Sequence, residues 1–384
     1  MNVVRKTISE ITSQLSALLK TGIYDFCDIE TAIDEHTLLM KDGALVTSYQ
    51  VLGTTSIVGN IEHGRIVDEL SNLQSNIEEP GYAIQICFTR SMDDSGNEVD
   101  TFIDGMRFSQ KRHGLDLDAV IDEKESLLKA SFSKEFCTIS LMTSPKVLNK
   151  TVLRSEQKAM IKHKAQYKIN TGLMGQGIDQ FCHSLLKHHD TFCGVFEKLA
   201  KGNIEIHKCK AKKSLKLLKQ EIDAADYDGF EPIVIGDTLP ISLNPELTFD
   251  DTTHINYPAM AYQLFSWPIN LLSESNQGDP SIIQYGRNYI APMIVDQPPT
   301  EIKPFSKLFS AIDKNIPYRL SIRLSSGHDA ITSAIKVQQI ISTALLVTSQ
   351  KNREISEGAD HILQKISKEG DILVKTNIDR KSVV

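Results

Sequence analysis

The sequence predicts an α+β fold, with mixed or antiparallel sheet layers covered by helices and a helical, basic middle segment. Three observations support this class: an opening β-hairpin, apolar patterns that switch between strand and helix spacing, and a lysine-rich helical stretch in the middle. The length of 384 residues allows two or three domains. We expect an N-terminal α+β domain at 1–145, a basic, mainly helical segment at 146–230, and a second α+β portion ending in paired helices at 231–384.

The N-terminal domain opens with two predicted strands, 36–40 and 44–53, joined at Asp42-Gly43. An Asp-Gly pair between apolar runs favours a type I′ turn, which needs a positive φ at both central residues. Successive side chains of a strand point to opposite faces. We therefore expect one face of the second strand to carry Leu45, Thr47, Tyr49 and Val51, and the other face to carry Val46, Ser48, Gln50 and Leu52.

The remaining elements follow from the spacing of apolar residues and from breakers such as Pro80-Gly81. The sheet of the first domain should be covered by helices on one side. In the strand at 317–325 we expect Arg319, Ser321 and Arg323 to point outward. The predicted helices are 8–19, 62–77, 99–113, 118–129, 155–170, 178–201, 212–225, 329–349 and 355–368, and the predicted strands are 82–89, 136–143, 204–209, 233–235, 289–295, 317–325 and 371–376.

Composition and cysteine use favour a cytosolic protein. No apolar run approaches the roughly 18 residues of a membrane-spanning helix, and the polar N-terminus, with Glu10, does not fit a signal peptide. The six cysteines include no CxxC pair, and Cys87 and Cys137 lie in apolar strand patterns. We therefore expect reduced, buried thiols and not a disulfide framework.

The net charge of −7 conceals a strongly basic segment. Residues 146–220 contain 16 Lys and Arg against 5 Asp and Glu, a local charge of +11, so the rest of the chain sums to −18. Such a stretch can dock on an acidic protein or an anionic membrane face, bind nucleic acid, or remain a solvated face. Tyr167 is the only Tyr or Trp in the segment, which disfavours base stacking. As the interaction surface we take Lys208, Lys210, Lys212, Lys213, Lys216 and Lys219.

No motif for nucleotide hydrolysis is present in the sequence. The chain lacks GxxxxGK[ST], whose backbone amides and lysine hold the phosphates of a nucleotide, and it also lacks GxSxG and HExxH. The glycines of 172–177 are interpreted as a flexible joint between helices. Residues 233–237, IVIGD, are similar to a Walker B strand, but without a phosphate cradle we interpret them as a strand that enters a turn.

His36 beside Glu35 fits a general base with an orienting acid or, as we favour, a hydrogen-bonded residue at a strand edge.

A run of histidines and cysteines is the candidate for a metal site: Cys182, His183, His188, His189, Cys193, His207 and Cys209. Zinc prefers four nitrogen or sulfur ligands, which often come in close pairs such as His207 with Cys209. We favour the simpler interpretation of core cysteines with surface histidines, because Cys182 and Cys193 fit an apolar helix face. The prediction is therefore that this chain holds no metal.

Residues 34–53, DEHTLLMKDGALVTSYQVLG, combine an acidic–His pair, a strand, an Asp-Gly turn and a strand that ends in Gly. This stretch resembles the opening hairpin of the conjugation and type IV secretion ATPases, in particular their DotO/IcmB and TraU-like branch. The alternating strand and long helix at 317–349 add to the resemblance. It implies an N-terminal α+β portion that attaches a C-terminal RecA-like motor to the inner-membrane part of the apparatus.

The resemblance implies a non-catalytic docking and assembly region of a type IV secretion ATPase, cytoplasmic and peripheral at the bacterial inner membrane. Its partners would be inner-membrane subunits of the apparatus, a partner ATPase, further copies of the chain in a hexamer or hexamer of dimers, and the membrane surface. The Walker motifs that define the family are missing here, so no catalytic residue is carried over. ATP and Mg²⁺ would belong only to a motor domain beyond Val384, and no cofactor is expected in this chain. The alternative is a cytosolic nucleic-acid-binding protein that uses the basic segment.

Overall fold

The computed structural model describes residues 27–54, 59–72, 77, 79–91, 96–131, 134–166, 180–222, 229–235, 237, 258–267, 269–271, 282–285, 288–294, 317–326, 335–336, 357–361 and 374–383. The predicted helix at 8–19 and the glycine-rich stretch 172–177 lie outside these residues. So does the predicted helix at 329–349, apart from residues 335–336. The following description concerns the described residues alone.

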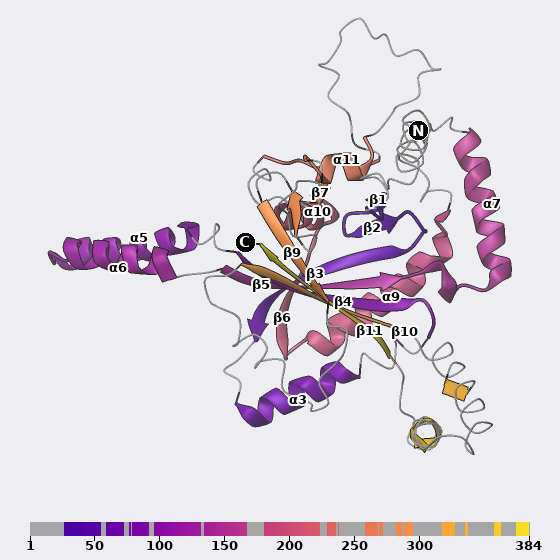
Figure 1. Ribbon diagram of the computed structural model, residues 1–384, viewed down its shortest axis with the longest axis horizontal. Coiled ribbons are helices and arrows are strands. Elements are labelled where there is room, and N and C mark those ends of the chain that lie inside the picture. Colours follow the sequence, from indigo (N-terminus) through magenta and orange to yellow (C-terminus); the bar gives the residue numbers. More distant parts are fainter. Residues whose placement is uncertain are drawn as a thin grey trace, which may run out of the picture.

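One antiparallel sheet organises the chain, which has the predicted α+β fold (Figure 1). Its strands are β1 (Ile29–Ala32), β2 (Thr37–Met40), β3 (Leu45–Thr54), β4 (Tyr82–Ser91), β5 (Lys134–Thr143), β6 (Ile204–Lys208), β7 (Ile269–Leu271), β8 (Ile283–Tyr285), β9 (Asn288–Ile294), β10 (Tyr318–Ser326) and β11 (Val374–Val383). They follow the order β1-β2-β3-β5-β4-β10-β11-β9-β8-β7, and β6 pairs with β3. Each of the described pairings is antiparallel.

The α+β portions predicted at 1–145 and 231–384 share this sheet. β4 pairs with β10 from Ala83 opposite Ser325 to Arg90 opposite Tyr318. β10 pairs in turn with β11, which therefore lies in the interior of the sheet between β10 and β9. A boundary near residue 230 thus does not divide the sheet.

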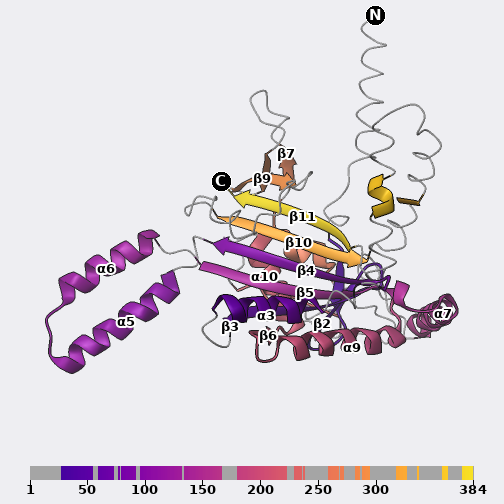
Figure 2. The same ribbon diagram turned by 90° about the horizontal axis from the view of Figure 1, so that it is seen from below.

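Helices cover both faces of the sheet, whereas one covered side was predicted for the first domain (Figure 1). The described helices are α3 (Asn60–Ser71), α5 (Gly96–His113), α6 (Asp118–Ser131), α7 (Lys150–Gln166), α9 (His183–Ala200), α10 (Ala211–Ile222) and α11 (Met260–Leu264), with a 3-10 turn η1 (Pro145–Val147). α9 packs on one face, and α10 with α11 packs on the other. α5 and α6 form a hairpin that projects away from the sheet (Figure 2). Among these described helices, none combines the length and apolarity that a membrane crossing requires.

Apolar side chains on both faces of β3 explain why a helical layer is needed on each side of the sheet. Leu45 and Tyr49 pack against α9, whereas Val46 packs against α10 and α11. The two faces predicted for this strand are thus confirmed at these positions. Because each face carries buried apolar side chains, each face gains stability from a helix that removes it from water.

The opening hairpin is present, but its turn differs from the predicted type I′ turn. The Gly43 N–H donates to the Met40 carbonyl at 3.0 Å, and the Met40 N–H donates to the Ala44 carbonyl at 2.8 Å. This is a three-residue loop, which ends in a left-handed residue, and Gly43 has a φ of 82°. A Cβ at Gly43 would also lie 2.4 Å from the carbonyl oxygen of Gln180. Both the conformation and the close contact therefore require glycine.

Two other predictions are corrected by local contacts. Residues 233–235 do not form a strand, because side chains accept their backbone N–H groups in place of a neighbouring strand. The accepting side chains are those of Gln263, Asp237 and Thr31. α9 begins at His183 and not at 178, since Cys182 has an extended conformation with φ −126° and ψ 122°.

Candidate interaction site

The predicted lysine surface is largely paired within the chain. Lys208 contacts Glu197 at 3.2 Å, Lys210 contacts Glu35 at 2.7 Å, Lys212 contacts Asp237 at 2.7 Å, Lys213 donates to the Gln50 amide oxygen at 3.2 Å, and Lys216 contacts Glu231. The hydrogen bond from Lys210 lowers the pKa of Glu35. Exposed pairs of this kind add little stability. They do, however, compensate much of the positive charge that the sequence places here.

Lys219 does not belong to this surface, because only 2% of it is exposed. Its Nζ donates to the Leu264 carbonyl at 3.0 Å and to the Ser266 hydroxyl. Leu264 is the last residue of α11, so Lys219 places its charge at the negative end of that helix. The prediction that Lys219 is an interaction residue is wrong. Helical spacing groups it with the exposed lysines, but α11, about forty residues further along the chain, covers it.

The histidine–cysteine run separates into buried thiols and exposed histidines, with one exception. Cys182, Cys193 and Cys209 are buried, and all six cysteines of the chain are free. His183, His188 and His207 are exposed, as predicted. His189 is fully buried, so its predicted surface position is wrong. Within the described part of the chain, no group of three His, Cys, Asp or Glu residues could hold a metal ion.

His189 joins α9 to two strands through both of its ring nitrogens. Nε2 lies 2.8 Å from the Thr47 hydroxyl on β3, and Nδ1 lies 2.9 Å from the Thr143 hydroxyl on β5. The Cys193 sulfur is 3.6 Å from Nε2. Burial, assisted by the charge of Lys208, lowers the pKa of His189 to about 4, so the ring is neutral at pH 7. A neutral imidazole with both nitrogens satisfied is a structural link between the helix and the sheet.

His36 is tied to the backbone and not to its acidic neighbour. Its Nδ1 lies 3.0 Å from the Cys209 carbonyl, while Glu35 is paired with Lys210. Asp34 accepts the His36 backbone N–H at 2.8 Å. The geometry supports a hydrogen-bonded residue at a strand edge and not a general base with an orienting acid.

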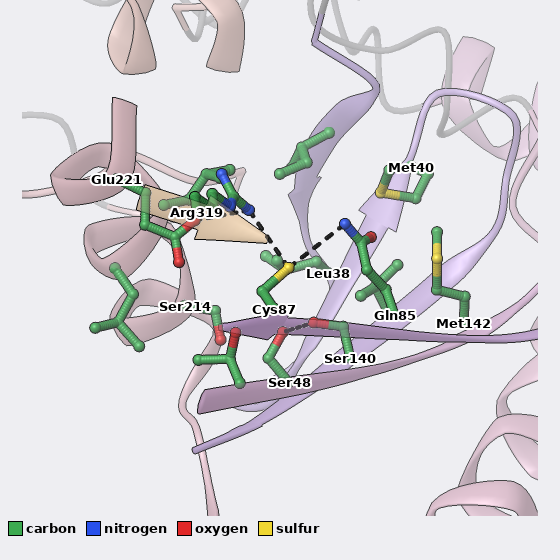
Figure 3. Close-up of a pocket in the computed structure, with 15 residues that line it drawn as sticks. Leu38, Met40, Ser48, Gln85, Cys87, Ser140, Met142, Ser214, Glu221 and Arg319 are labelled. Atoms are coloured by element: carbon green, nitrogen blue, oxygen red, sulfur yellow. Dashed lines mark hydrogen bonds and ion pairs between the residues drawn. The ribbon is translucent and has the colours of Figure 1, made fainter. Parts of the chain in front are cut away.

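A cavity of about 160 Å³, lined mainly by apolar surface with a few polar side chains, lies between α10 and the sheet (Figure 3). Arg319 pairs there with Glu221 of α10 at 2.7 Å and donates to the Cys87 sulfur at 3.6 Å. Gln85 donates to the same sulfur at 3.7 Å and to the Ser321 hydroxyl at 2.9 Å. Arg319 and Ser321 therefore face inward, and their predicted outward orientation is wrong because α10 covers this face. Since Arg319 and Glu221 compensate each other, the pair serves to attach α10 to β10.

The α5–α6 hairpin exposes large apolar side chains that the main core does not use. A small core of Val99, Ile103 and Ile121 holds the two helices together, and Arg107 pairs across them with Asp122 at 2.9 Å. Figure 2 shows that the hairpin extends clear of the sheet. The exposed apolar residues are Phe102, Phe108, Leu115, Leu117, Val120 and Leu127. Such a concentration of apolar surface is typical of an interaction site.

An open groove of about 560 Å³ follows α5 on this hairpin. Small residues, Thr101, Gly105 and Ser109, lie along it, and Phe102 and Leu117 also line it. Sequence reasoning missed this surface because it predicted a helix at 99–113 and assigned no role to its outer face. The signal was available: Phe102 and Phe108 lie off the stripe of Val99 and Ile103 that packs on α6, so α5 has a second apolar face.

Comparison with known proteins found no protein-family model that matches the chain and no curated protein with significant similarity to it. The secretion-ATPase assignment therefore stays a proposal, and function is inferred from the surfaces described above. Among these, the hairpin has an exposure that the fold of the described chain does not account for.

Proposed function

We propose that this chain is a non-catalytic docking and assembly region of a type IV secretion or conjugation ATPase. It would attach the motor to inner-membrane subunits of the apparatus at the cytoplasmic side of the membrane, and would bring a partner ATPase and further copies of the chain together. The sequence contains no phosphate-binding GxxxxGK[ST] motif, so the action assigned to these residues is contact and not turnover.

The observation that supports this proposal is the projecting α5–α6 hairpin. Its own core and its ion pairs keep it folded away from the sheet, while Phe102, Phe108 and Leu127 remain exposed. Exposed apolar side chains cost free energy in water unless another surface covers them. A partner that covers the hairpin would gain that free energy, which is the physical basis proposed for docking.

The alternative, binding of nucleic acid by the basic segment, draws less support from the geometry. Affinity for a polyanion depends on cations that are free to replace counterions at the phosphates. Lys210, Lys212 and Lys216 already contact carboxylates of the chain, and Lys219 is buried. Nucleic-acid binding therefore serves as the competing outcome of the test.

The test is co-sedimentation of the purified chain with membranes from cells that make the inner-membrane subunits of the apparatus. Membranes from cells without those subunits are the control. The chain should pellet only with the apparatus membranes, and the binding should persist as salt is raised, because apolar contacts are not screened. Equal pelleting with both membranes would contradict the proposal. A salt-sensitive shift of DNA on a gel, lost when Lys208, Lys210, Lys212 and Lys213 are changed to Glu, would favour the alternative.

A further inference from the structure

One side of α5 carries a pattern that the described fold does not use. Val99 and Ile103 face α6 and meet Ile121 there. With about 100° between successive residues of a helix, the line of positions 98, 105 and 112 lies well away from this core. Gly105 is exposed on that line. Phe102 and Phe108 flank it, one on each side, and are 51% and 68% exposed.

Among the described residues of the protomer, no contact gives Gly105 a packing role. Glycine in a helix interior is destabilising relative to alanine, because the unfolded chain loses more freedom. A Cβ built on Gly105 meets nothing within 4 Å in the described structure, and Gly105 is not among the glycines with positive φ. Neither packing nor backbone conformation therefore requires glycine here. A physical use that remains is the close approach of a second backbone.

We infer that α5 pairs with α5 of a second copy of this chain, antiparallel, with Gly105 at the crossing point. Two-fold symmetry then sets Gly105 against Gly105 of the second copy, so that the helices come close together. Phe102 lies over Ser109 of the second copy and Phe108 over its Thr101, so each large side chain meets a small one. The open groove along Thr101, Gly105 and Ser109 is the space that these side chains enter.

The charges of α5 fit an antiparallel pair. In the sequence of this helix, the acidic positions 98, 100 and 104 come in the first half, and Lys111, Arg112 and His113 form the last turn. Antiparallel pairing sets the basic last turn of each helix beside the acidic half of the other, with Arg112 opposite position 98 twice in the dimer. Parallel pairing would bring like charges together, which disfavours it.

The position of the hairpin leaves room for this pairing. Because α5 and α6 project from the sheet, a second hairpin can lie along α5 without first displacing a part of the described fold (Figure 2). A two-fold contact of this kind uses the same surface on both copies and closes on itself. The inference deepens the assembly role and rests on that proposed function for its cellular meaning.

The first test is the oligomeric state of the full chain by sedimentation velocity at micromolar concentrations. The unmodified chain should sediment as a dimer. Gly105→Leu should sediment as a monomer, because the leucine side chain holds the two backbones apart. Glu123→Leu adds the same side chain at an exposed position of α6, to which the pairing assigns no contact, and should remain dimeric. Circular dichroism checks that both variants keep their helix content.

The second test exchanges the charges. Arg112→Glu should weaken the dimer roughly tenfold, since symmetry creates two like-charged contacts, and the double variant with Glu98→Arg should recover the lost affinity. A monomeric unmodified chain, a dimer that survives Gly105→Leu, or a charge exchange without recovery would each overturn the inference. The membrane assay separates the two proposals. A monomer that still binds apparatus membranes refutes the pairing alone, and a dimer that does not bind them refutes the docking role alone.

Discussion

The buried imidazole of His189 makes the stability of this protein depend on pH in a defined window. Its pKa is about 4 in the folded chain against 6.5 for a free histidine. Between these values the unfolded state binds a proton that the folded state does not, so the free energy of unfolding rises with pH. From pH 7 to pH 5 this group alone should lower the free energy of unfolding by about 2 kcal/mol, and below pH 4 the total should reach roughly 3 kcal/mol.

Urea unfolding at a series of pH values measures this effect. His189→Gln keeps polar groups between Thr47 and Thr143 but cannot titrate. From pH 7 to pH 5 its free energy of unfolding should therefore fall by about 2 kcal/mol less than that of the unmodified chain. His188→Gln is the matched control, because His188 is the exposed neighbour, and it should keep the full dependence. Identical pH dependence for the His189→Gln variant and the unmodified chain would refute the assignment of a neutral, buried imidazole.

Three further predictions use the same fold. Arg319→Met should lower the free energy of unfolding by roughly 3 kcal/mol, measured by urea unfolding, because the buried Glu221 loses its cation. Adding Glu221→Leu should restore most of this loss. If it restores nothing, the pair does not attach α10 to β10. Gly202→Ala should lower the free energy of unfolding by about 1 kcal/mol, because of the positive φ alone. Gly43→Ala should lower it by roughly 2 kcal/mol or more, because the added Cβ also meets the Gln180 carbonyl. Equal melting temperatures for the two variants would contradict this. Isothermal calorimetry with ATP and Mg²⁺ should show no binding, and tight binding would contradict the docking role.

Local patterns were sufficient to predict most of the strands. The alternation of β3 places Leu45 and Tyr49 on one face and Val46 on the other, because the side-chain period of a strand is fixed by its backbone. The order of the strands was not predictable in this way. The pairing of β4 with β10 joins segments more than two hundred residues apart, and no local pattern specifies such a partner.

The side chains that were wrongly placed share one cause. Lys219, His189 and Arg319 are polar residues whose own segments predicted exposure. α11 covers Lys219, and α10 covers Arg319. His189 is buried where α9 meets β3 and β5. Lys219 and His189 are buried and Arg319 is largely covered, because a distant segment supplies each with a hydrogen-bond or charge partner. Such a partner cannot be read from the neighbouring sequence.

The central claim is that the hairpin docks the chain, and removal of the hairpin tests it most directly. Ser91 of β4 and Lys134 of β5 are paired across the ladder, so a short turn can replace residues 92–133 without changing the sheet. The shortened chain should fold, yet remain in the supernatant when apparatus membranes are sedimented. The variant with reversed charges at Lys208, Lys210, Lys212 and Lys213 should still pellet. If the shortened chain pellets as well as the unmodified one, the hairpin is not the docking element and the account is contradicted.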